Sequence, residues 1–574
     1  MTAAASSETG AVLTGIAAVP GRERSRTLIC VLLPSLTDVL FISLLCATYG
    51  LLGQRLLADS DIGWHIRNGE HMFATRSVPQ ADYFSYTMTG RPWYAWEWLY
   101  DAIIAGIHHF AGLNGVVLFS AAVFALTFTL LFRLAWRGSR SVPIAFCLTL
   151  LAAAAASVHL LARPHLFTWL FTLIWLDRLS AFQRGQARNL LSLPLLMTLW
   201  VNLHGGFLVG VALLALFLTA NLWTVLTASS QLRRSLARGR LAHLSVVFLA
   251  TLAATLLTPY GYRLYFHLHG YLGDTYLMDH ILEFLSPNFH LAQVKAFALL
   301  LMVVLAALAI GHRVRILDVG IVACAVWAGL YAARNVPLAA ILLTVTISPW
   351  LGTALRRMPV RPDIAIAWRG LAAKAQRLSA WMGTMESRLV GHAWPATILA
   401  LLIVTAPAAS SRKATMIVFN EKRMPVEAAE FMAGHNIRDH FFSPDFWGGY
   451  LVYRLYPNVR LMVDDRHDFY GTPFVRDYLT MLQVGPAWRN LLDANRVNWV
   501  LAPCDSSLAN ALKVVPGWRV IHEDETAVIF ERTVPLEFTS TTGWSRPEAL
   551  LHPLEGRNKM RHNKWEVGHP PPQD

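Results

Sequence analysis

The sequence predicts a polytopic α-helical membrane protein that ends in a small soluble α/β domain. Of its 574 residues, 55% are hydrophobic and only 15% are charged, whereas soluble domains carry about 25% charged residues. Long apolar runs fill the chain before residue 411, and after it short apolar runs alternate with polar segments. A soluble enzyme is excluded because its surface would be too apolar, and a disordered chain is excluded because disorder needs low hydrophobicity.

Eleven apolar runs are predicted to cross the bilayer, which takes about 20 apolar residues per helix. They lie at 28–56, 113–132, 141–161, 164–182, 189–204, 206–227, 242–258, 292–311, 315–332, 336–354 and 394–410. Together they define a membrane domain over 28–410. The run at 189–204 is short, so a re-entrant segment is an alternative there.

Basic residues predict the orientation of the spans. If the N-terminal segment 1–27 is cytoplasmic, arginines cluster in every second loop, and the segment 355–393 adds seven basic residues. The opposite loops hold isolated arginines at Arg163, Arg263 and Arg334. This alternation follows the positive-inside rule. We also expect 355–393 to form a basic amphipathic helix on the inner leaflet, where membrane lipid with anionic headgroups attracts it.

The same orientation places the loop 58–112, the loop 259–291 and everything after 411 outside the cytoplasm. The net charge of +13 is then explained by cytoplasmic loops. Because the chain carries no nucleic-acid-binding motif, we expect no nucleic acid partner.

Residues 411–535 predict an extracytoplasmic α/β domain. Helical patterns occur near 425–435, 446–456, 473–495 and 506–514, and short strand-like runs at 459–463, 499–502, 518–521 and 527–530. Strands that alternate with helices indicate a layered α/β fold. The tail 536–574, rich in proline, histidine and charge, is predicted to be disordered.

The first outer loop opens with a pair of acidic residues, in the segment Asp59-Ser-Asp61-Ile-Gly-Trp-His65. In a helix, Asp61 and His65 lie four residues apart on one face, so the carboxylate can orient the imidazole. A carboxylate pair can also accept a proton or bind a divalent cation. A solvated helix cap is the alternative interpretation of this pattern.

Glu97 stands between two tryptophans in the run RPWYAWEWL at the end of the same loop. Aromatic residues at a membrane surface usually form an interfacial belt. A carboxylate among rings also suits a sugar, because rings pack on its apolar faces and the carboxylate binds its hydroxyls. Glu97 and His65 are therefore candidate substrate-binding residues.

Further polar groups are predicted at the outer ends of spans and in the loop 259–291. They are Arg163 with His165, Asn202 with His204, Arg334 with Asn335, and Glu283. Ionisable groups at membrane depth are costly and usually functional, although snorkelling to the surface also accounts for an arginine there. In a cleft, Arg163 and Arg334 suit a phosphate, which arginine binds bidentately. The remaining candidates for substrate binding are His165, Asn202, His204 and Glu283.

Six runs of the chain are distinctive: DSDIGWHIRNGE, RPWYAWEWL, ARPHLFTWL, LWVNLHGGF, WGGYLVYRLYP and VDDRHDFYG. With the acidic motif Asp59-Ser-Asp61 in the first outer loop, many spans and a soluble outer domain, they resemble the GT-C glycosyltransferases. These are polytopic membrane enzymes that use polyprenyl-phosphate-linked sugar donors. The resemblance to bacterial membrane proteins of this type covers most of residues 30–532.

The resemblance implies an enzyme of the bacterial inner membrane that transfers a sugar from such a donor to an extracytoplasmic glycan, lipid or protein. Asp59 or Asp61 would act as the base, and the anomeric centre would be inverted. In protein O-mannosyltransferases of this type an acidic residue of the motif acts as base without metal, whereas in oligosaccharyltransferases it helps to bind a cation. The cofactor is thus left open, with a divalent cation at Asp59 and Asp61 as one alternative.

Two other classes of function remain as alternatives. A lipid-linked-saccharide transporter needs charges within several spans and usually an internal repeat, whereas the predicted polar groups lie mainly at outer ends. A non-catalytic envelope assembly protein would bind partners through its outer domain. In that domain 446–450 and 463–468 are candidates to contact an acceptor, and a salt bridge of Arg466 that closes the domain is the alternative for the second segment.

Overall fold

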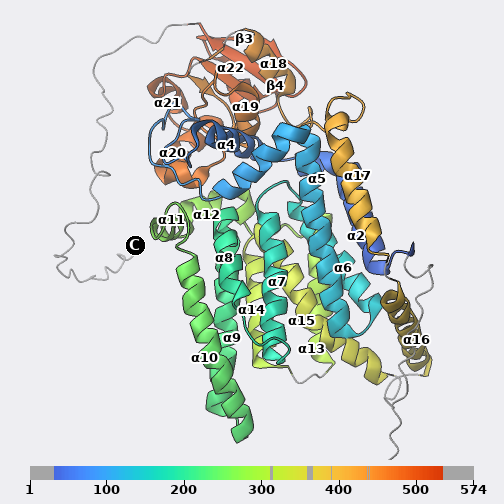
Figure 1. Cartoon of the computed structure of the whole chain (residues 1–574). Coiled ribbons are helices and arrows are strands. Elements are labelled where there is room, and N and C mark those ends of the chain that lie inside the picture. Colours follow the sequence, from blue (N-terminus) through green and yellow to red (C-terminus); the bar gives the residue numbers. More distant parts are fainter. Residues whose placement is uncertain are drawn as a thin grey trace, which may run out of the picture. The chain divides into compact units, whose positions relative to one another are not determined.

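The computed structural model of the chain is mostly helical (Figure 1). It describes residues 32–310, 314–358, 366–389, 391–435, 437–438 and 440–533. The predicted cytoplasmic segment 1–27 and the predicted disordered tail 536–574 lie outside the described residues.

Helices account for most of the described chain as far as Ser410. They are α2 (Leu36–Cys46), η1 (Ala47–Leu51), α3 (Gly53–Leu56), α4 (Ile62–Thr75), α5 (Trp98–Ser139), α6 (Val142–Ala156), η2 (Ser157–His159), α7 (His165–Gln183), α8 (Ser192–Leu203), η3 (Gly205–Phe207), α9 (Leu208–Thr227), α10 (Gln231–Ala254), α11 (Arg263–Leu272), α12 (Thr275–His280), η4 (Leu282–Phe284), α13 (Ala292–Ala309), α14 (Ile316–Tyr331), η5 (Ala333–Asn335), α15 (Val336–Arg357), α16 (Ile366–Arg388) and α17 (Ala393–Ser410).

Each of the eleven predicted spans coincides with a helix among the described residues. Seven helices are long and apolar enough to cross a membrane: Trp98–Ser139, Val142–His159, Gly205–Thr227, Gln231–Ala254, Ala292–Ala309, Ala333–Arg357 and Ala393–Ser410. Three predicted spans correspond to shorter apolar helices, Leu36–Leu51, Ser192–Leu203 and Ile316–Tyr331, and one corresponds to α7. The helical membrane domain is therefore confirmed, while the number of its spans stays a prediction.

A bend in α5 separates the predicted outer loop from the predicted span. The helix runs for 42 residues, but Gly112 has φ 56° and ψ −156°, a conformation that glycine adopts readily because it has no Cβ. The part before the bend belongs to the loop 58–112, and the part after it is the span predicted at 113–132. The Oγ of Ser410, the last residue of α17, donates a hydrogen bond to the carbonyl of Ala111 (2.6 Å), so the bend is tied to α17.

Two glycines allow α4 to pack closely against its neighbours. A Cβ on Gly69 would lie 2.1 Å from the carbonyl oxygen of Asp101 in α5. A Cβ on Gly63 would lie 2.2 Å from the carbonyl oxygen of Gly449 in α19 (Gly448–Leu455). Any side chain at these positions would push the helices apart, so the glycines fix α4, and the acidic motif that precedes it, between α5 and α19.

The C-terminal region contains a four-stranded sheet in the order β1-β2-β4-β3. Its elements are α18 (Val426–Gly434), β1 (Phe441–Phe442), η7 (Asp445–Trp447), α19, α20 (His467–Leu482), α21 (Trp488–Ala494), β2 (Trp499–Pro503), α22 (Ser507–Val514), β3 (Trp518–Glu523) and β4 (Ala527–Arg532). β1 pairs with β2 in parallel, and β4 pairs antiparallel with both β2 and β3. The predicted α/β character of this region is confirmed.

Two predictions for this region are wrong in detail. The run 459–463 forms no strand, and its Leu461 makes only isolated bridges to Ser85 and Phe441. The single helix predicted over 473–495 is two helices, because Val484 and Ala487 between them adopt positive φ (58° and 65°). Apolar periodicity continues across this break and hides it.

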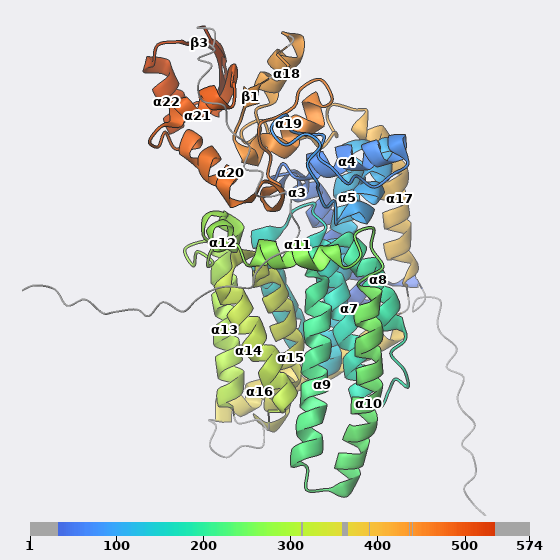
Figure 2. The same ribbon diagram turned by 90° about the vertical axis from the view of Figure 1, so that its left-hand side faces the viewer.

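Residues 411–533 lie at one end of the helix bundle, called the domain end below (Figure 1). Helix α11 lies across this end beneath the sheet (Figure 2). Its His267 forms a hydrogen bond through Nε2 with Asp468 Oδ2 (3.0 Å). The loop 259–291, which contains α11, therefore meets both the helix bundle and the C-terminal region at the domain end.

Candidate functional site

A cavity of about 410 Å³ opens at the domain end. Its lining includes eight of the residues predicted from the sequence as site residues: Asp61, His65, Glu97, Arg163, His165, His204, Glu283 and Arg334. These residues come from the loop 58–112, three turns between helices (α6–α7, α8–α9 and α14–α15) and the loop before α13. Folding thus collects polar sets that are far apart in the sequence into one cavity.

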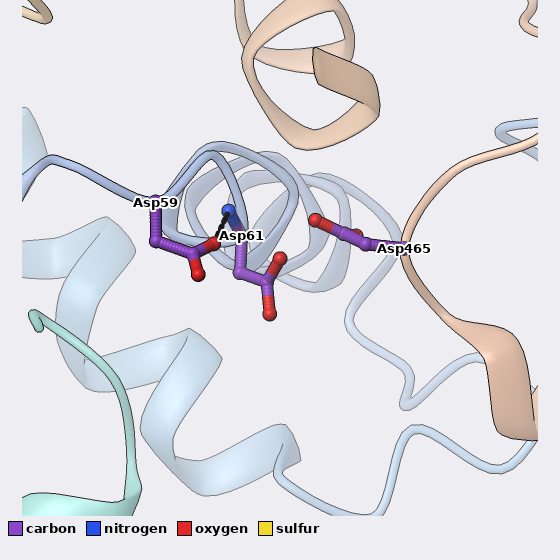
Figure 3. Close-up of side chains that lie close together, drawn as sticks. All are labelled: Asp59, Asp61 and Asp465. Carbon is purple, nitrogen blue, oxygen red and sulfur yellow. Dashed lines mark hydrogen bonds between the residues drawn. The ribbon is translucent and has the colours of Figure 1, made fainter. Parts of the chain in front are cut away.

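Asp59 and Asp61 lie in the turn between α3 and α4, beside the cavity. The backbone N–H of Asp61 donates to Asp59 Oδ1 (3.0 Å), which holds the turn. Arg163 Nη2 lies 2.9 Å from Asp59 Oδ1 and also forms an ion pair with Asp61 Oδ2. From the other side Asp465 of the C-terminal region points toward Asp61 (Figure 3). Three carboxylates and one guanidinium therefore converge.

The two aspartates of the motif differ in their electrostatic state. Burial opposes ionisation of Asp59, but the neighbouring Arg163 outweighs it and lowers the pKa of this carboxyl below its ordinary value. Burial raises the pKa of Asp61 well above its ordinary value, and the nearby charges of Asp465 and Asp59 add to this effect although Arg163 opposes it. A carboxylate with a raised pKa is a better general base than an ordinary one, so Asp61 suits proton transfer and Asp59 suits ion pairing.

Glu283 bridges the two arginines that the sequence predicts as phosphate ligands. Its Oε2 lies 3.4 Å from Arg163 Nη1, and its Oε1 lies 3.0 Å from Arg334 Nη1. Burial alone would raise the pKa of Glu283, but Arg334 and Arg163 lower it to about 2. The carboxylate is therefore ionised at neutral pH and is held between two guanidinium groups.

At another part of the cavity lie two imidazoles with a carboxyl group between them. Glu97 Oε2 lies 3.8 Å from His65 Nε2, and Glu97 Oε1 lies 3.7 Å from His204 Nε2. Burial and the neighbouring Asp101 raise the pKa of Glu97 well above its ordinary value. Burial and then Arg163 lower the pKa of His65 to about 3. This part of the site is thus built from uncharged groups.

Hydrogen bonds engage the Nδ1 atom of each imidazole. His65 Nδ1 shares a hydrogen bond with Asp101 Oδ1 (2.5 Å), and its Nε2 faces Glu97. His204 Nδ1 accepts from the backbone N–H of Gly206 (2.9 Å), so its Nε2 is a donor toward Glu97. The predicted pairing of Asp61 with His65 is wrong: the carboxylate that orients His65 is Asp101, because α4 packs against α5 through Gly69.

Two of the predicted substrate-binding residues are engaged by the protein itself. Asn202 does not line the cavity, since its Oδ1 accepts from Trp98 Nε1 (2.7 Å) and its Nδ2 donates to the carbonyl of Leu257 (2.8 Å). This corrects the prediction for Asn202, whose amide joins helix ends instead. His165 lines the cavity, but its Nε2 donates to the carbonyl of His159 (2.9 Å).

A buried ion-pair cluster holds Asp465 in place. Arg466 Nη2 lies 2.7 Å from both Asp82 Oδ1 and Asp464 Oδ2, and all three side chains are at most 2% exposed. Because Asp82 belongs to the loop 58–112, this cluster joins the outer loop to the turn that carries Asp465. The hydroxyl of Ser60 also donates to Asp465 Oδ2 (3.1 Å). The predicted closing salt bridge of Arg466 is therefore present, and it positions a residue of the site.

Asp59, Asp61 and Asp465 also fit a divalent cation. One oxygen of each carboxylate lies within 4.8 Å of the others. Asp61 Oδ1 and Asp465 Oδ1 are buried and have no hydrogen-bond partner among the described residues. Oxygen ligands of this kind are those that Mg²⁺ and Ca²⁺ prefer. Arg163 already supplies one positive charge to Asp59 and Asp61.

Asp101 and Asp465 were not predicted as site residues. Asp101 lies four residues after Glu97, so helical periodicity places both on one face and was a usable signal. Asp465 was predicted only as a possible acceptor contact. Its place beside Asp61 depends on the packing of α19 against α4, which no local pattern encodes.

Comparisons with known proteins give a fold but no close relative. No protein-family model matches the chain, and no curated protein matches it in sequence. It is similar to the apo crystal structure of the Archaeoglobus fulgidus oligosaccharyltransferase, with a TM-score of 0.50 and 10% identity, over 87% of this chain and 75% of that one. The structure of ArnT from Cupriavidus metallidurans bound to undecaprenyl phosphate also matches, at 14% identity and a TM-score of 0.39, over 86% and 97% of the two chains.

The chain has the fold of this oligosaccharyltransferase. The likeness to the oligosaccharyltransferase runs through both the helical domain and the C-terminal region, since it covers 87% of the chain. With the seven long apolar helices, it makes the chain a multi-pass membrane protein. The fold predicted from the sequence resemblance is confirmed.

Proposed function

We propose that the protein is a glycosyltransferase that moves a sugar from a polyprenyl-phosphate-linked donor to an acceptor hydroxyl. The observation that carries this proposal is that one cavity holds two arginines beside a buried carboxylate of raised pKa, Asp61. The cavity lies at the end of a bundle of apolar helices, where we expect the phosphate of a membrane-bound carrier to lie if the bundle spans the bilayer. The fold, shared with an oligosaccharyltransferase, supports the same chemistry.

Arg163 and Arg334 hold the donor phosphate in this proposal. Guanidinium groups donate paired hydrogen bonds to phosphate oxygens, and both groups already bind an anion here, the carboxylate of Glu283. As the bond between the anomeric carbon and the phosphate oxygen breaks, its electron pair goes to that oxygen. The two arginines stabilise the negative charge that develops there.

Asp61 is the base. Its carboxylate takes the proton of the acceptor hydroxyl while the hydroxyl oxygen forms the new bond to the anomeric carbon. Direct displacement from the face opposite the phosphate inverts the anomeric centre. Asp59 pairs with Arg163 (2.9 Å) and keeps that guanidinium in place, which makes it a positioning residue.

The uncharged groups around Glu97 bind the hydroxyls of the sugar or of the acceptor. His204 Nε2 is a donor and the carboxyl oxygens of Glu97 can accept, so a hydroxyl that enters finds both kinds of partner. The gaps of 3.8 and 3.7 Å to Glu97 are longer than hydrogen bonds and leave room for such a group to make the contacts. The rings of Trp93 and Trp96 line the same cavity and suit the apolar face of a sugar.

A divalent cation, if the enzyme uses one, would be held by Asp59, Asp61 and Asp465. It would supply positive charge against the phosphate. The two arginines, Asp61 and the uncharged groups keep the roles given above.

The orientation of the protein is part of the proposal. Alternating basic loops place the domain end outside the cytoplasm, in the inner membrane of a bacterium. A reporter that is active only outside the cytoplasm, fused after about residue 420, is expected to be active. Activity of a cytoplasmic reporter at this position would mean that the number of spans before it differs by an odd number from eleven.

The decisive experiment is donor turnover by the purified protein in nanodiscs. Sugar-loaded polyprenyl phosphate is supplied with a mixed acceptor pool, and release of free polyprenyl phosphate is measured for the wild type and for Asp61→Asn. We expect release by the wild type only. Movement of intact donor between leaflets without release would favour the transporter class instead.

A further inference from the structure

The anion that lies between Arg163 and Arg334 belongs to the protein itself. Glu283 touches both guanidinium groups, at 3.4 and 3.0 Å, and its Oε2 lies 3.8 Å from His159 Nε2. Its side chain is 26% exposed, so it faces the cavity rather than the protein interior. Any phosphate that binds these two arginines must take the place of this carboxylate.

The turn that carries Glu283 is held through Phe284 and Leu285. It is a single 3-10 turn, η4, and the neighbouring Leu282 is 82% exposed. The backbone carbonyl of Leu285 accepts from the N–H of Ala333 (2.8 Å), and the ring of Phe284 lies 4.6 Å from the guanidinium of Arg334. The turn can therefore stay attached beside Arg334 while the Glu283 side chain swings away.

We infer that Glu283 makes the site select a donor with a single phosphate. Its carboxylate occupies the position of one monoanion, so the carrier that replaces it brings one negative charge. This inference rests on the proposed function. A sugar joined to a polyprenyl chain through one phosphate is a phosphodiester with one negative charge, the same charge as the carboxylate of Glu283. The exchange leaves the net charge of the site unchanged, whatever the protonation state of Asp61.

A carrier with two phosphates brings one negative charge more, and the cavity offers no spare cation for it among its described residues. Beyond Arg163 and Arg334, the guanidinium that lines it is Arg466, which is already paired with Asp82 and Asp464. The acidic lining includes Asp468, whose negative charge repels a second phosphate.

The first test compares two probes on the wild-type protein in nanodiscs with EDTA. The probes are farnesyl methyl phosphate, a monoanion, and farnesyl methyl diphosphate, a dianion, titrated by calorimetry. We expect the monoanion to bind at least about tenfold more tightly, the size of one charge-assisted contact. Equal or tighter binding of the diphosphate overturns the inference.

The second test removes the competing carboxylate. Glu283→Gln is expected to bind the monoanion about tenfold more tightly, because it no longer has to displace an anion. The dianion should gain by a larger factor, so that the preference for the monoanion shrinks. Asp279→Asn, an exposed acidic side chain in the same loop, serves as the matched control and is expected to leave both affinities unchanged. Unchanged or weaker binding by Glu283→Gln, or an undiminished preference for the monoanion, overturns the inference.

The same titration separates this inference from the proposed function. If Arg163→Gln and Arg334→Gln weaken binding of the monoanion but Glu283→Gln does not strengthen it, the phosphate site stands and the role of Glu283 is wrong. If the arginine variants bind as the wild type does, the phosphate assignment itself fails, and the inference fails with it.

Discussion

The two parts of the cavity differ in the charge of their buried groups. At one, Asp59, Arg163 and Glu283 are charged, and each is paired with an opposite charge. At the other, around Glu97, the groups are uncharged and are held by hydrogen bonds to neighbours such as Asp101. Burial explains the contrast, since a buried charge persists only beside an opposite one, and otherwise the group becomes neutral.

The difference indicates which part of the cavity serves each step of the proposed reaction. Negative charge moves onto the phosphate when the sugar leaves, so fixed cations are needed there. A sugar hydroxyl keeps no charge, so neutral donors and acceptors suffice to bind it. The predictions below test this division, beginning with the largest effect.

The base should give the largest effect. Asp61→Asn keeps the shape of the side chain but cannot take a proton, and a general base contributes about 10²–10⁴ in rate. We expect turnover to fall by about that factor, measured as release of polyprenyl phosphate at saturating donor. Asp59→Asn should lose less because it acts through Arg163. Normal turnover in both variants, with normal insertion, would remove the motif from the mechanism.

The pH dependence of the rate sharpens the same assignment. Because the pKa of Asp61 is raised, its ionised form grows only as the pH rises above the ordinary range of a carboxyl group. The wild-type rate should therefore increase with pH through this raised pKa, and Asp61→Asn should lack that limb. A rate that is constant from pH 5 to pH 8 argues against Asp61 as the base.

The arginines should show the next largest effect, in donor binding. Loss of one desolvated hydrogen-bond partner costs about 1–3 kcal/mol, so Arg334→Gln should weaken binding of farnesyl methyl phosphate roughly ten- to a hundredfold. Arg334→Lys keeps the charge but not the planar fork and should rescue binding only in part. Arg163→Gln should cost more, because Arg163 also pairs with Asp59 and Asp61. Equal affinities across the series contradict the phosphate site.

The uncharged part should tolerate an exchange that the charged part does not. Since the raised pKa of Glu97 favours its protonated form, Glu97→Gln replaces one neutral group by another of the same shape. We expect kcat within about threefold of the wild type, the range of a lost or weakened neutral hydrogen bond, with any change mainly in KM. A loss like that of Asp61→Asn would show that Glu97 acts as an ion, and the division into two parts would be wrong.

Acid stability should reveal the smallest effect. The pKa of Glu283 is about 2 in the folded protein, below its ordinary 4.5. Its ion pairs therefore stabilise the fold fully above pH 4.5, and that stabilisation is lost as the pH falls toward 2. The Tm of the wild type in nanodiscs should fall more steeply than that of Glu283→Gln between pH 5 and pH 3. Parallel curves would show that the ion pairs contribute no stability.

Local physics made much of this protein predictable from its sequence. The length and hydropathy of each apolar run predict its helix, because a backbone in lipid must satisfy its own hydrogen bonds. The same reasoning, with basic loops, put Asp61, Glu97, Arg163 and Arg334 on one side of the membrane, and eight predicted residues line one cavity. Helical spacing also relates Glu97 to Asp101.

The tertiary structure alone decided which of these groups touch. Asp465 lies beside Asp61 because Gly63 and Gly449 let α4 and α19 approach closely, and Glu283 lies between two arginines because η4 packs beside η5. Asn202 does not belong to the candidate site because its amide is hydrogen-bonded to Trp98 and Leu257. The sequence by itself thus determined the helices and predicted which charges share one end of the bundle, since hydropathy and helical period act within short segments. Which charges become partners depends on the packing of distant helices, so only the fold determines it.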